Sequence, residues 1–305
     1  MRVLILGAGA VGGYIGARLL ASGADVAFLA RGRRLETLSR DGLVVRSPLG
    51  DFAGKVAAAG TPPAGFQPDV LIIACKAPAL GDALRTIAPA LAPETRLLPL
   101  LNGVAHLETL QSHYPTTALL GGLTHGAVTL RDDGVIDHLT PFFTMVVGPV
   151  SGEPDPVARS FGERIAKTGL DVSLSDNIRQ AMWEKFVFLA TLAGATCLMR
   201  ASVGTIMAAE NGEDVILELL AESLAVARAE GFEPEAAAMA SDKRVLTERG
   251  SALTSSMLRD VLSGRHTEAN HILGDMLRRA RRHGLGAPLL TIANAQLQCH
   301  EATVA

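Results

Sequence analysis

The sequence predicts an α/β N-terminal half built on a doubly wound parallel sheet and an all-helical C-terminal half. Short apolar runs alternate with helix-like segments in the first half. A glycine-rich turn follows the first of these runs, and strand-like patterns stop at Asp176. We therefore expect two domains, residues 1–175 and residues 176–305.

Four continuous apolar runs are typical of buried parallel strands. They are Val3–Leu6, Asp25–Leu29, Val70–Cys75 and Arg96–Leu101. Between them, Gly12–Ser22 and Ala79–Leu91 suit crossover helices. This alternation predicts a doubly wound parallel sheet.

The middle of the chain has a different pattern. A DDG turn separates Ala127–Leu130 from Val135–Leu139, which predicts a β-hairpin. A further strand is expected at Phe143–Gly148, and then a helix that prolines open and Gly169 ends.

The second half predicts helices only, with glycines as C-terminal breakers. The expected helices are Asn177–Arg200, Glu213–Glu230, Pro234–Arg249, Ser255–Leu262, Thr267–His283 and Pro288–His300.

Composition limits the classes of function. Of 305 residues, 48% are hydrophobic and 19% are charged, which argues against disorder, and the net charge of −3 draws the chain to neither nucleic acid nor an anionic membrane. The cysteines are far apart and lack metal-ligand spacing, so we expect no metal and a cytoplasmic protein with reduced thiols. The longest apolar run, Phe186–Met199, is shorter than a membrane span and predicts a buried helix.

The glycine-rich turn is the clearest functional signal. Gly7, Gly9 and Gly12 form G-x-G-x-x-G between the first strand and an amphipathic helix. In this context the glycines allow a tight turn, close approach of the backbone to a pyrophosphate, and close packing of helix on strand. An ordinary glycine-rich turn is the alternative.

The next strand indicates which nucleotide is bound. Many such strands end in an acid that accepts hydrogen bonds from a ribose 2′-hydroxyl, but here Arg31 follows the strand and no acid occupies positions 26 to 35. A guanidinium can hold a 2′-phosphate through two parallel hydrogen bonds. The sequence therefore predicts NADP(H), with Arg31 as the main contact and Arg33 or Arg34 assisting. A solvated basic loop is the alternative.

Three further polar residues lie next to apolar segments. Lys76 and Asn102 come after two of the predicted strands, at the sheet edge where open α/β folds bind ligands, although each could be a plain surface or turn residue. Lys185 is the last charge before the long apolar run. Burial could lower its pKa and suit it to general acid catalysis, or it could simply extend from a core helix to water.

Two serines and two acids stand out in the last third of the chain, namely Ser255, Ser256, Asp260 and Glu268. Ser256 and Asp260 share a helix face, where capping is the alternative role. Glu268 is expected within its helix beside an apolar stripe, where a carboxylate needs a partner or a function. The helical half could carry a homodimer surface, although its apolar faces are also needed for its own core.

The motifs together resemble the ketopantoate reductase family. The resemblance rests on GAGAVGGYIGARL, LARGRR, CKAPAL, LNGV, LTHGA, WEKF and the block SSMLRDVLSGRHTEANHILGDMLRRARRHG, and it spans nearly the whole chain. It implies a Rossmann-like domain, a helical domain like the C-terminal domain of 6-phosphogluconate dehydrogenase, and reduction of 2-dehydropantoate to pantoate by NADPH in the pantothenate pathway.

The resemblance also implies roles for the residues that match. Gly7, Gly9, Gly12 and Arg31 would bind the cofactor, and Lys76 and Asn102 would lie at its nicotinamide end. Lys185 would be the general acid. Asn102 and Glu268 would orient the lysine or the substrate, and Ser256 would receive the substrate carboxylate.

One departure bears on the substrate. The family usually has asparagines four and eight residues after its lysine, where this chain has Leu189 and Ala193. Loss of two polar groups that would meet the substrate can change specificity by orders of magnitude. A reductase of another 2-keto acid, or a related enzyme of a 3-hydroxy acid, is therefore the first alternative. An NADPH-binding sensor without enzymatic activity is the second.

Overall fold

The computed structural model describes residues 1–304 of the chain, which divide into two compact units. The first unit contains Met1–Leu101 and His106–Arg179. The second contains Gln180–Ala305 together with the short segment Asn102–Ala105. The expected boundary at residue 175 did not anticipate that four residues after a strand of the first half would group with the helical half.

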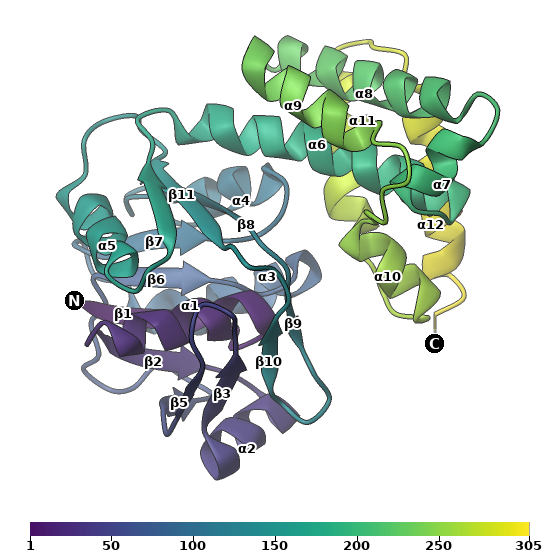
Figure 1. Cartoon of the computed structure of the whole chain (residues 1–305). Helices are drawn as coiled ribbons and strands as arrows, with labels where there is room; N and C mark the ends of the chain where they lie inside the picture. Colours follow the sequence, from purple (N-terminus) through teal and green to yellow (C-terminus); the bar gives the residue numbers. More distant parts are fainter. Residues whose placement is uncertain (305) are drawn as a thin grey trace. The chain divides into compact units, whose positions relative to one another are not determined.

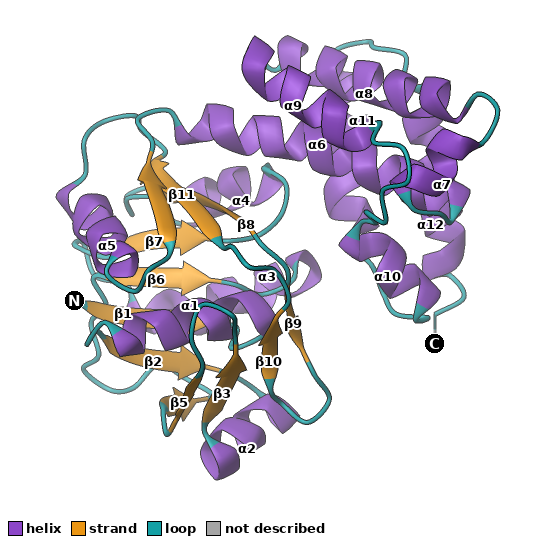
Figure 2. Ribbon diagram, viewed as in Figure 1, coloured by secondary structure: helices purple, strands orange, loops and turns teal. Residues whose placement is uncertain are grey.

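The first unit is organised around a five-stranded parallel sheet with strand order β5-β2-β1-β6-β7. The strands are β1 (Arg2–Leu6), β2 (Asp25–Leu29), β5 (Ala57–Ala59), β6 (Val70–Ile73) and β7 (Arg96–Pro99). Four of these are the apolar runs that predicted them, and they are buried because helices cover both faces. Figure 2 shows α1 (Ala10–Ala21) on one face of the sheet and α3 (Leu80–Ile87) on the other.

Two smaller sheets complete this unit. One has the order β4-β3-β10-β9 and the other the order β12-β11-β8. Their strands are β3 (Leu43–Arg46), β4 (Phe52–Gly54), β8 (Leu120–His125), β9 (Val128–Leu130), β10 (Ile136–His138), β11 (Thr144–Pro149) and β12 (Asp171–Leu174). The predicted hairpin is confirmed, because β9 and β10 pair antiparallel across the DDG turn.

Helices fill the remaining connections of the first unit. They are α2 (Gly32–Asp41), α4 (Ala105–His113), α5 (Pro156–Ala166) and the 3-10 turns η1 (Ala77–Ala79) and η2 (Ala88–Ala90). The side chain of Asp155 caps α5 by accepting hydrogen bonds from the backbone N–H groups of Val157 and Ala158. The alternative that the arginine cluster is a solvated loop is not borne out, since Arg31 is the N-cap of α2 and Arg33 and Arg34 lie in its first turn.

The second unit consists of helices in its described residues (Figure 1). They are α6 (Ile178–Met199), α7 (Val203–Ala208), α8 (Gly212–Ala229), α9 (Ala236–Leu246), α10 (Ser256–Leu262), α11 (Ala269–Arg282) and α12 (Pro288–Glu301). By length and composition α6 could cross a membrane, but 67% of its most apolar window is buried in the protein. That burial is the behaviour of a core helix, as the sequence predicts.

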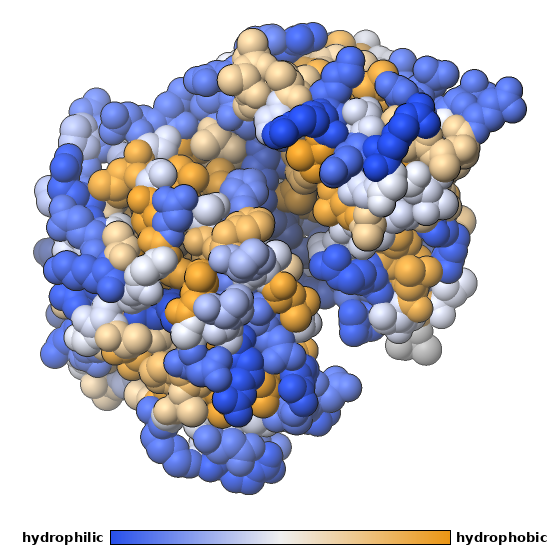
Figure 3. Space-filling view, viewed as in Figure 1, coloured by the Kyte–Doolittle hydropathy of each residue, from blue (hydrophilic) through white to orange (hydrophobic). Residues whose placement is uncertain are grey.

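Hydrophilic side chains cover most of the face seen in Figure 3, with apolar side chains in scattered patches. The large hydrophobic residues that are exposed include Leu139 and Phe142, both in the loop between β10 and β11, and Leu262 at the end of α10. A few exposed apolar residues of this kind are usual on folded proteins.

Candidate active site

The glycine-rich turn has the geometry that its three glycines were expected to provide. Gly7 has a φ of +98°, and a Cβ atom there would lie 2.7 Å from the carbonyl oxygen of Ala74. A Cβ atom on Gly12 would lie 2.1 Å from the carbonyl oxygen of Gly7. Both distances are too short for any other residue, so these two glycines hold the turn against β6 and α1.

Gly9 differs from the other two glycines. Nothing lies within 4 Å of the position that its Cβ atom would take, so the space beside its backbone is open. Gly9 is also the N-cap of α1, and no side chain caps this helix end. The first N–H groups of α1 are therefore left to an external acceptor, and the helix dipole favours an anion there.

A cavity of about 270 Å³ opens at this turn. Its lining residues are Leu6, Gly7, Ala8, Gly9, Leu29, Ala30, Arg31, Arg34, Gly60, Cys75, Thr86 and Leu130. The cavity thus joins two of the predicted glycines to the predicted arginine at the carboxyl ends of β1 and β2. Gly12 and Lys76 are not among its lining residues, because Gly12 packs the helix and Lys76 is exposed beyond β6.

The three arginines after β2 have different surroundings. Arg31 lines the cavity, and its side chain is 59% exposed. Arg33 points to the β9–β10 turn, where its Nη2 donates to the carbonyl of Asp132. Arg34 donates from Nε to the carbonyl of Ala8 and from Nη1 to that of Gly134.

Arg34 therefore ties the glycine turn to the β9–β10 turn. Sequence reasoning gave Arg34 only an assisting role toward the nucleotide and missed this structural one. No local pattern would have found it, because its partner Gly134 lies 100 residues away in the sequence.

These features fit a dinucleotide. The Nη2 atom of Arg34 is buried without a hydrogen-bond partner among the described residues, beside a cavity that this arginine helps to line. Uncapped helix N–H groups, open space at Gly9 and two guanidinium groups are the donors that phosphates require.

Asn102 is placed by the helical unit. It is partly buried, its backbone is hydrogen-bonded to the ring of His271 on α11, and a Cβ atom on Gly103 would lie 3.4 Å from the Cδ2 atom of that ring. Burial lowers the pKa of His271, so this ring is neutral near pH 7. No local sequence pattern indicates His271, which fixes the turn that carries Asn102.

Lys185 lies on α6 and is partly buried. Burial lowers the pKa of its ammonium group to about 8. A lysine of this kind is still mostly protonated near pH 7 and gives up its proton far more readily than an exposed lysine. This is the property that general acid catalysis near neutral pH requires.

The face of α6 beyond Lys185 is apolar for two turns. Leu189 lies one turn further along and is partly buried, and Ala193 is 4% exposed. Neither side chain can donate a hydrogen bond, so this helix face offers no polar side chain at these two positions.

The two serines at the start of α10, Ser255 and Ser256, have different surroundings. Ser255 is the N-cap: its Oγ accepts from the backbone N–H of Leu258 and lies 2.8 Å from Oγ1 of Thr196 on α6. The capping role considered for Ser256 therefore belongs to Ser255, and Ser256 is exposed at the first helical position. Asp260 forms an ion pair with Arg265.

Glu268 lies just outside its helix. The expectation that it stands within the helix was wrong, because α11 begins at Ala269 and Glu268 is its N-cap, partly buried. The preceding Thr267 donates to Oε1 of Glu301 from both its N–H and its hydroxyl, at 2.6 Å each. These hydrogen bonds to the end of α12 fix Thr267, the residue directly before Glu268.

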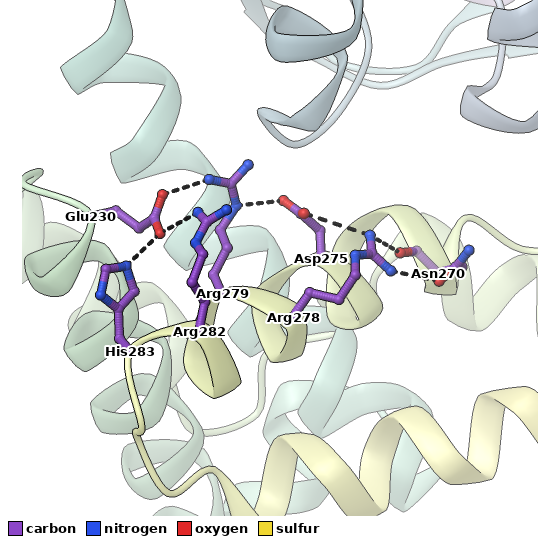
Figure 4. Close-up of polar contacts among 7 residues, drawn as sticks. All are labelled: Glu230, Asn270, Asp275, Arg278, Arg279, Arg282 and His283. Atoms are coloured by element: carbon purple, nitrogen blue, oxygen red, sulfur yellow. Dashed lines mark hydrogen bonds and ion pairs between the residues drawn. The ribbon is translucent and has the colours of Figure 1, made fainter.

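A buried ionic network supports the same helices. Arg279 of α11 is 3% exposed and bonds both Asp275 and Glu230, which lies just after α8 (Figure 4). Its guanidinium also lies 5.2 Å from the ring centre of Trp183 on α6. Arg279 therefore links α11, the end of α8 and α6. Its contact on α6, Trp183, lies two residues before Lys185.

Comparison with known proteins agrees with this geometry. The family model described as "Ketopantoate reductase PanE/ApbA" matches residues 3–152, and that of its C-terminal part matches residues 177–301. The chain is 36% identical to an uncharacterized oxidoreductase, YkpB, of Bacillus subtilis, and the match covers 99% of both chains. It is 28% identical to a 2-dehydropantoate 2-reductase of Halobacterium salinarum over 95% of both.

Solved structures give the same result. A PanE/ApbA family ketopantoate reductase from Ralstonia eutropha superposes with a TM-score of 0.89 at 26% identity and covers 99% of both chains. A 2-dehydropantoate 2-reductase from Methylococcus capsulatus shares the fold with a TM-score of 0.90, at 24% identity and over 100% of this chain and 98% of the other. The chain therefore belongs to the ketopantoate reductase family of oxidoreductases.

Proposed function

We propose that the chain reduces a 2-keto acid to the 2-hydroxy acid with NADPH, and that 2-dehydropantoate, which would give pantoate, is the first substrate to test. The observation that carries the proposal is Lys185, a partly buried lysine whose pKa is lowered to about 8. Family membership over both halves of the chain supports it.

The nucleotide would be held by the first unit. Gly7 and Gly9 bring backbone to its pyrophosphate, the uncapped end of α1 faces that charge, and Arg31 takes the 2′-phosphate. Lys76 would meet the nicotinamide end. The bound nicotinamide supplies a hydride equivalent.

Lys185 would act on the substrate carbonyl. As the carbonyl carbon is reduced, negative charge grows on its oxygen, and an ammonium group beside that oxygen stabilises the charge and donates a proton from Nζ. Asn102 and Glu268 would orient the lysine or the substrate. The exposed hydroxyl of Ser256 would donate to the substrate carboxylate.

A second candidate is a 2-keto acid with a less polar side chain. Leu189 and Ala193 favour it, because an apolar helix face next to Lys185 cannot satisfy the hydroxyl group that 2-dehydropantoate carries. The chemistry at the ketone and the cofactor would be unchanged.

We also propose that the enzyme acts in the cytoplasm. Its cysteines are thiols in the described part of the chain, with Cys197 buried, which suits a reducing compartment.

The test is NADPH oxidation by the purified protein over a panel of 2-keto acids that includes 2-dehydropantoate. Fast consumption with 2-dehydropantoate, and much slower consumption with NADH, supports the first candidate. Preference for an apolar 2-keto acid supports the second. Binding of NADPH with no turnover of any keto acid contradicts both and indicates a sensor.

A further inference from the structure

An acidic residue lies against the arginine that would read the 2′-phosphate. Oδ2 of Asp82, in the first turn of α3, lies 3.8 Å from Nη1 of Arg31, and the two side chains are 57% and 59% exposed. Thr86, one turn further along α3, lines the nucleotide cavity and donates from Oγ1 to the carbonyl of Asp82. Asp82 is therefore at the rim of that cavity, beside Arg31.

Arg31 differs from the other two arginines of its cluster in the kind of contact that its side chain makes. The side chains of Arg33 and Arg34 donate to backbone carbonyls, whereas the contact of Arg31 is with a carboxylate. Asp82 is shared, because it also forms an ion pair with Arg85, one turn along α3. Asp82 thus contacts two guanidinium groups, those of Arg31 and Arg85.

The two nucleotides respond to this carboxylate in opposite ways. A 2′-phosphate on Arg31 is a dianion that Asp82 repels, and it must compete with Asp82 for the same guanidinium. A 2′-hydroxyl carries no charge and can donate a hydrogen bond to a carboxylate, which is how many NAD-binding folds use an acid. Asp82 therefore opposes the selectivity that Arg31 provides.

We propose that Asp82 is a specificity-determining residue that weakens NADPH binding and so reduces the preference of the site for NADPH over NADH. The proposal rests on the proposed function, since it takes the cavity to bind a nicotinamide dinucleotide through Arg31. It concerns how strongly the chain discriminates between the two nucleotides.

The test is the dissociation constant of each reduced nucleotide, measured by the change in nicotinamide fluorescence on binding, with no keto acid present. In Asp82→Asn we expect NADPH to bind about three- to tenfold more tightly, the range set by an exposed ion pair and a nearby phosphate dianion. NADH should bind equally or slightly more weakly. The gain for NADPH should shrink as salt is raised, because both charges are exposed.

Glu163→Gln is the matched control, since it removes the same charge from the exposed side of α5 (Pro156–Ala166), which contributes no lining residue. Unchanged NADPH affinity in Asp82→Asn, or a gain shared by NADH or by the control, would overturn the proposal. Thermal melting of both variants checks that the fold is intact.

Arg31→Gln separates this proposal from the proposed function. If Arg31→Gln weakens NADPH while Asp82→Asn changes nothing, the role of Asp82 is wrong and the cofactor assignment stands. If Arg31→Gln leaves NADPH unaffected, the assignment of Arg31 fails, and a gain in Asp82→Asn would still show direct repulsion of the phosphate.

Discussion

Nε of Arg34 lies 2.6 Å from the carbonyl oxygen of Ala8, so an arginine of α2 holds the middle of the glycine turn. Arg34→Gln removes this contact and the one to Gly134. We expect NADPH and NADH to lose affinity by the same factor, about tenfold, because the turn that both share loses its support. Nucleotide fluorescence titration measures this.

Arg31→Gln and Arg33→Gln are the comparisons for Arg34. Loss of Arg31 should weaken NADPH alone, and loss of Arg33, whose contact lies in the β9–β10 turn, should change little. A selective loss of NADPH in the Arg34 variant would show that Arg34 binds the 2′-phosphate instead of supporting the turn.

Alanine substitutions of Gly12 and Gly9 should affect different properties, the first the stability of the protein and the second its affinity for the nucleotide. Gly12→Ala puts a Cβ atom 2.1 Å from a backbone oxygen, so we expect it to destabilise the protein by about 2 to 4 kcal/mol. Gly9→Ala meets nothing within 4 Å and should leave stability unchanged, yet weaken nucleotide binding at least about tenfold because the methyl group occupies the space beside the pyrophosphate. Urea unfolding and nucleotide titration measure the two effects. Equal stability of the two variants would contradict the packing argument.

The sequence predicted the parts of the fold that burial dictates. The strands β1, β2, β6 and β7 are continuous apolar runs because both faces of their sheet are covered. It did not predict β5, which is three alanines, since alanine has little β-propensity and only pairing with β2 makes this segment a strand. Nor did it predict α2, whose sequence GRRLETLSRD has a single buried residue, Leu38.

The candidate site was predictable where a local motif sets the geometry. Gly7, Gly9 and Arg31 were expected to act together, and they line one cavity. The roles of Arg34 and His271 depend on partners far away in the sequence, Gly134 and Asn102, so no spacing could reveal them. The helix α10 begins at Ser256, one residue later than expected, and for this reason Ser255 rather than Ser256 is its N-cap.

The buried network around Glu230 should stabilise the helical unit. Burial alone would raise the pKa of Glu230, but hydrogen bonds from Arg282, His283 and Arg279 outweigh it and lower the pKa to about 2 (Figure 4). By linkage, a carboxylate shifted from 4.5 to about 2 contributes about 3 kcal/mol above the unfolded-state pKa, and this is lost as the pH falls from about 4.5 to about 2.

Glu230→Gln tests this contribution. Urea unfolding near pH 7 should show a loss of about 2 to 3 kcal/mol, and the difference from the wild type should shrink steadily below about pH 4.5. A difference that stays constant with pH would mean that the carboxylate charge is not what stabilises the unit.

The pH dependence of kcat/KM should report the protonation state of Lys185. A general acid must be protonated, so activity should be present below the pKa of Lys185, about 8, and fall as the pH rises through it. Steady-state rates with a saturating level of NADPH over about pH 6 to about pH 10 give this profile. An activity that stays constant across this range would exclude Lys185 as the proton donor.

The most direct test of the central claim is the turnover of Lys185→Ala with the best keto acid of the panel, measured beside its affinity for NADPH. We predict that kcat falls by about 10² to 10⁴, the usual contribution of a positioned general acid, while the dissociation constant of NADPH stays within about twofold of the wild type. Turnover retained within about twofold of the wild type would contradict the assignment of Lys185 as the catalytic acid.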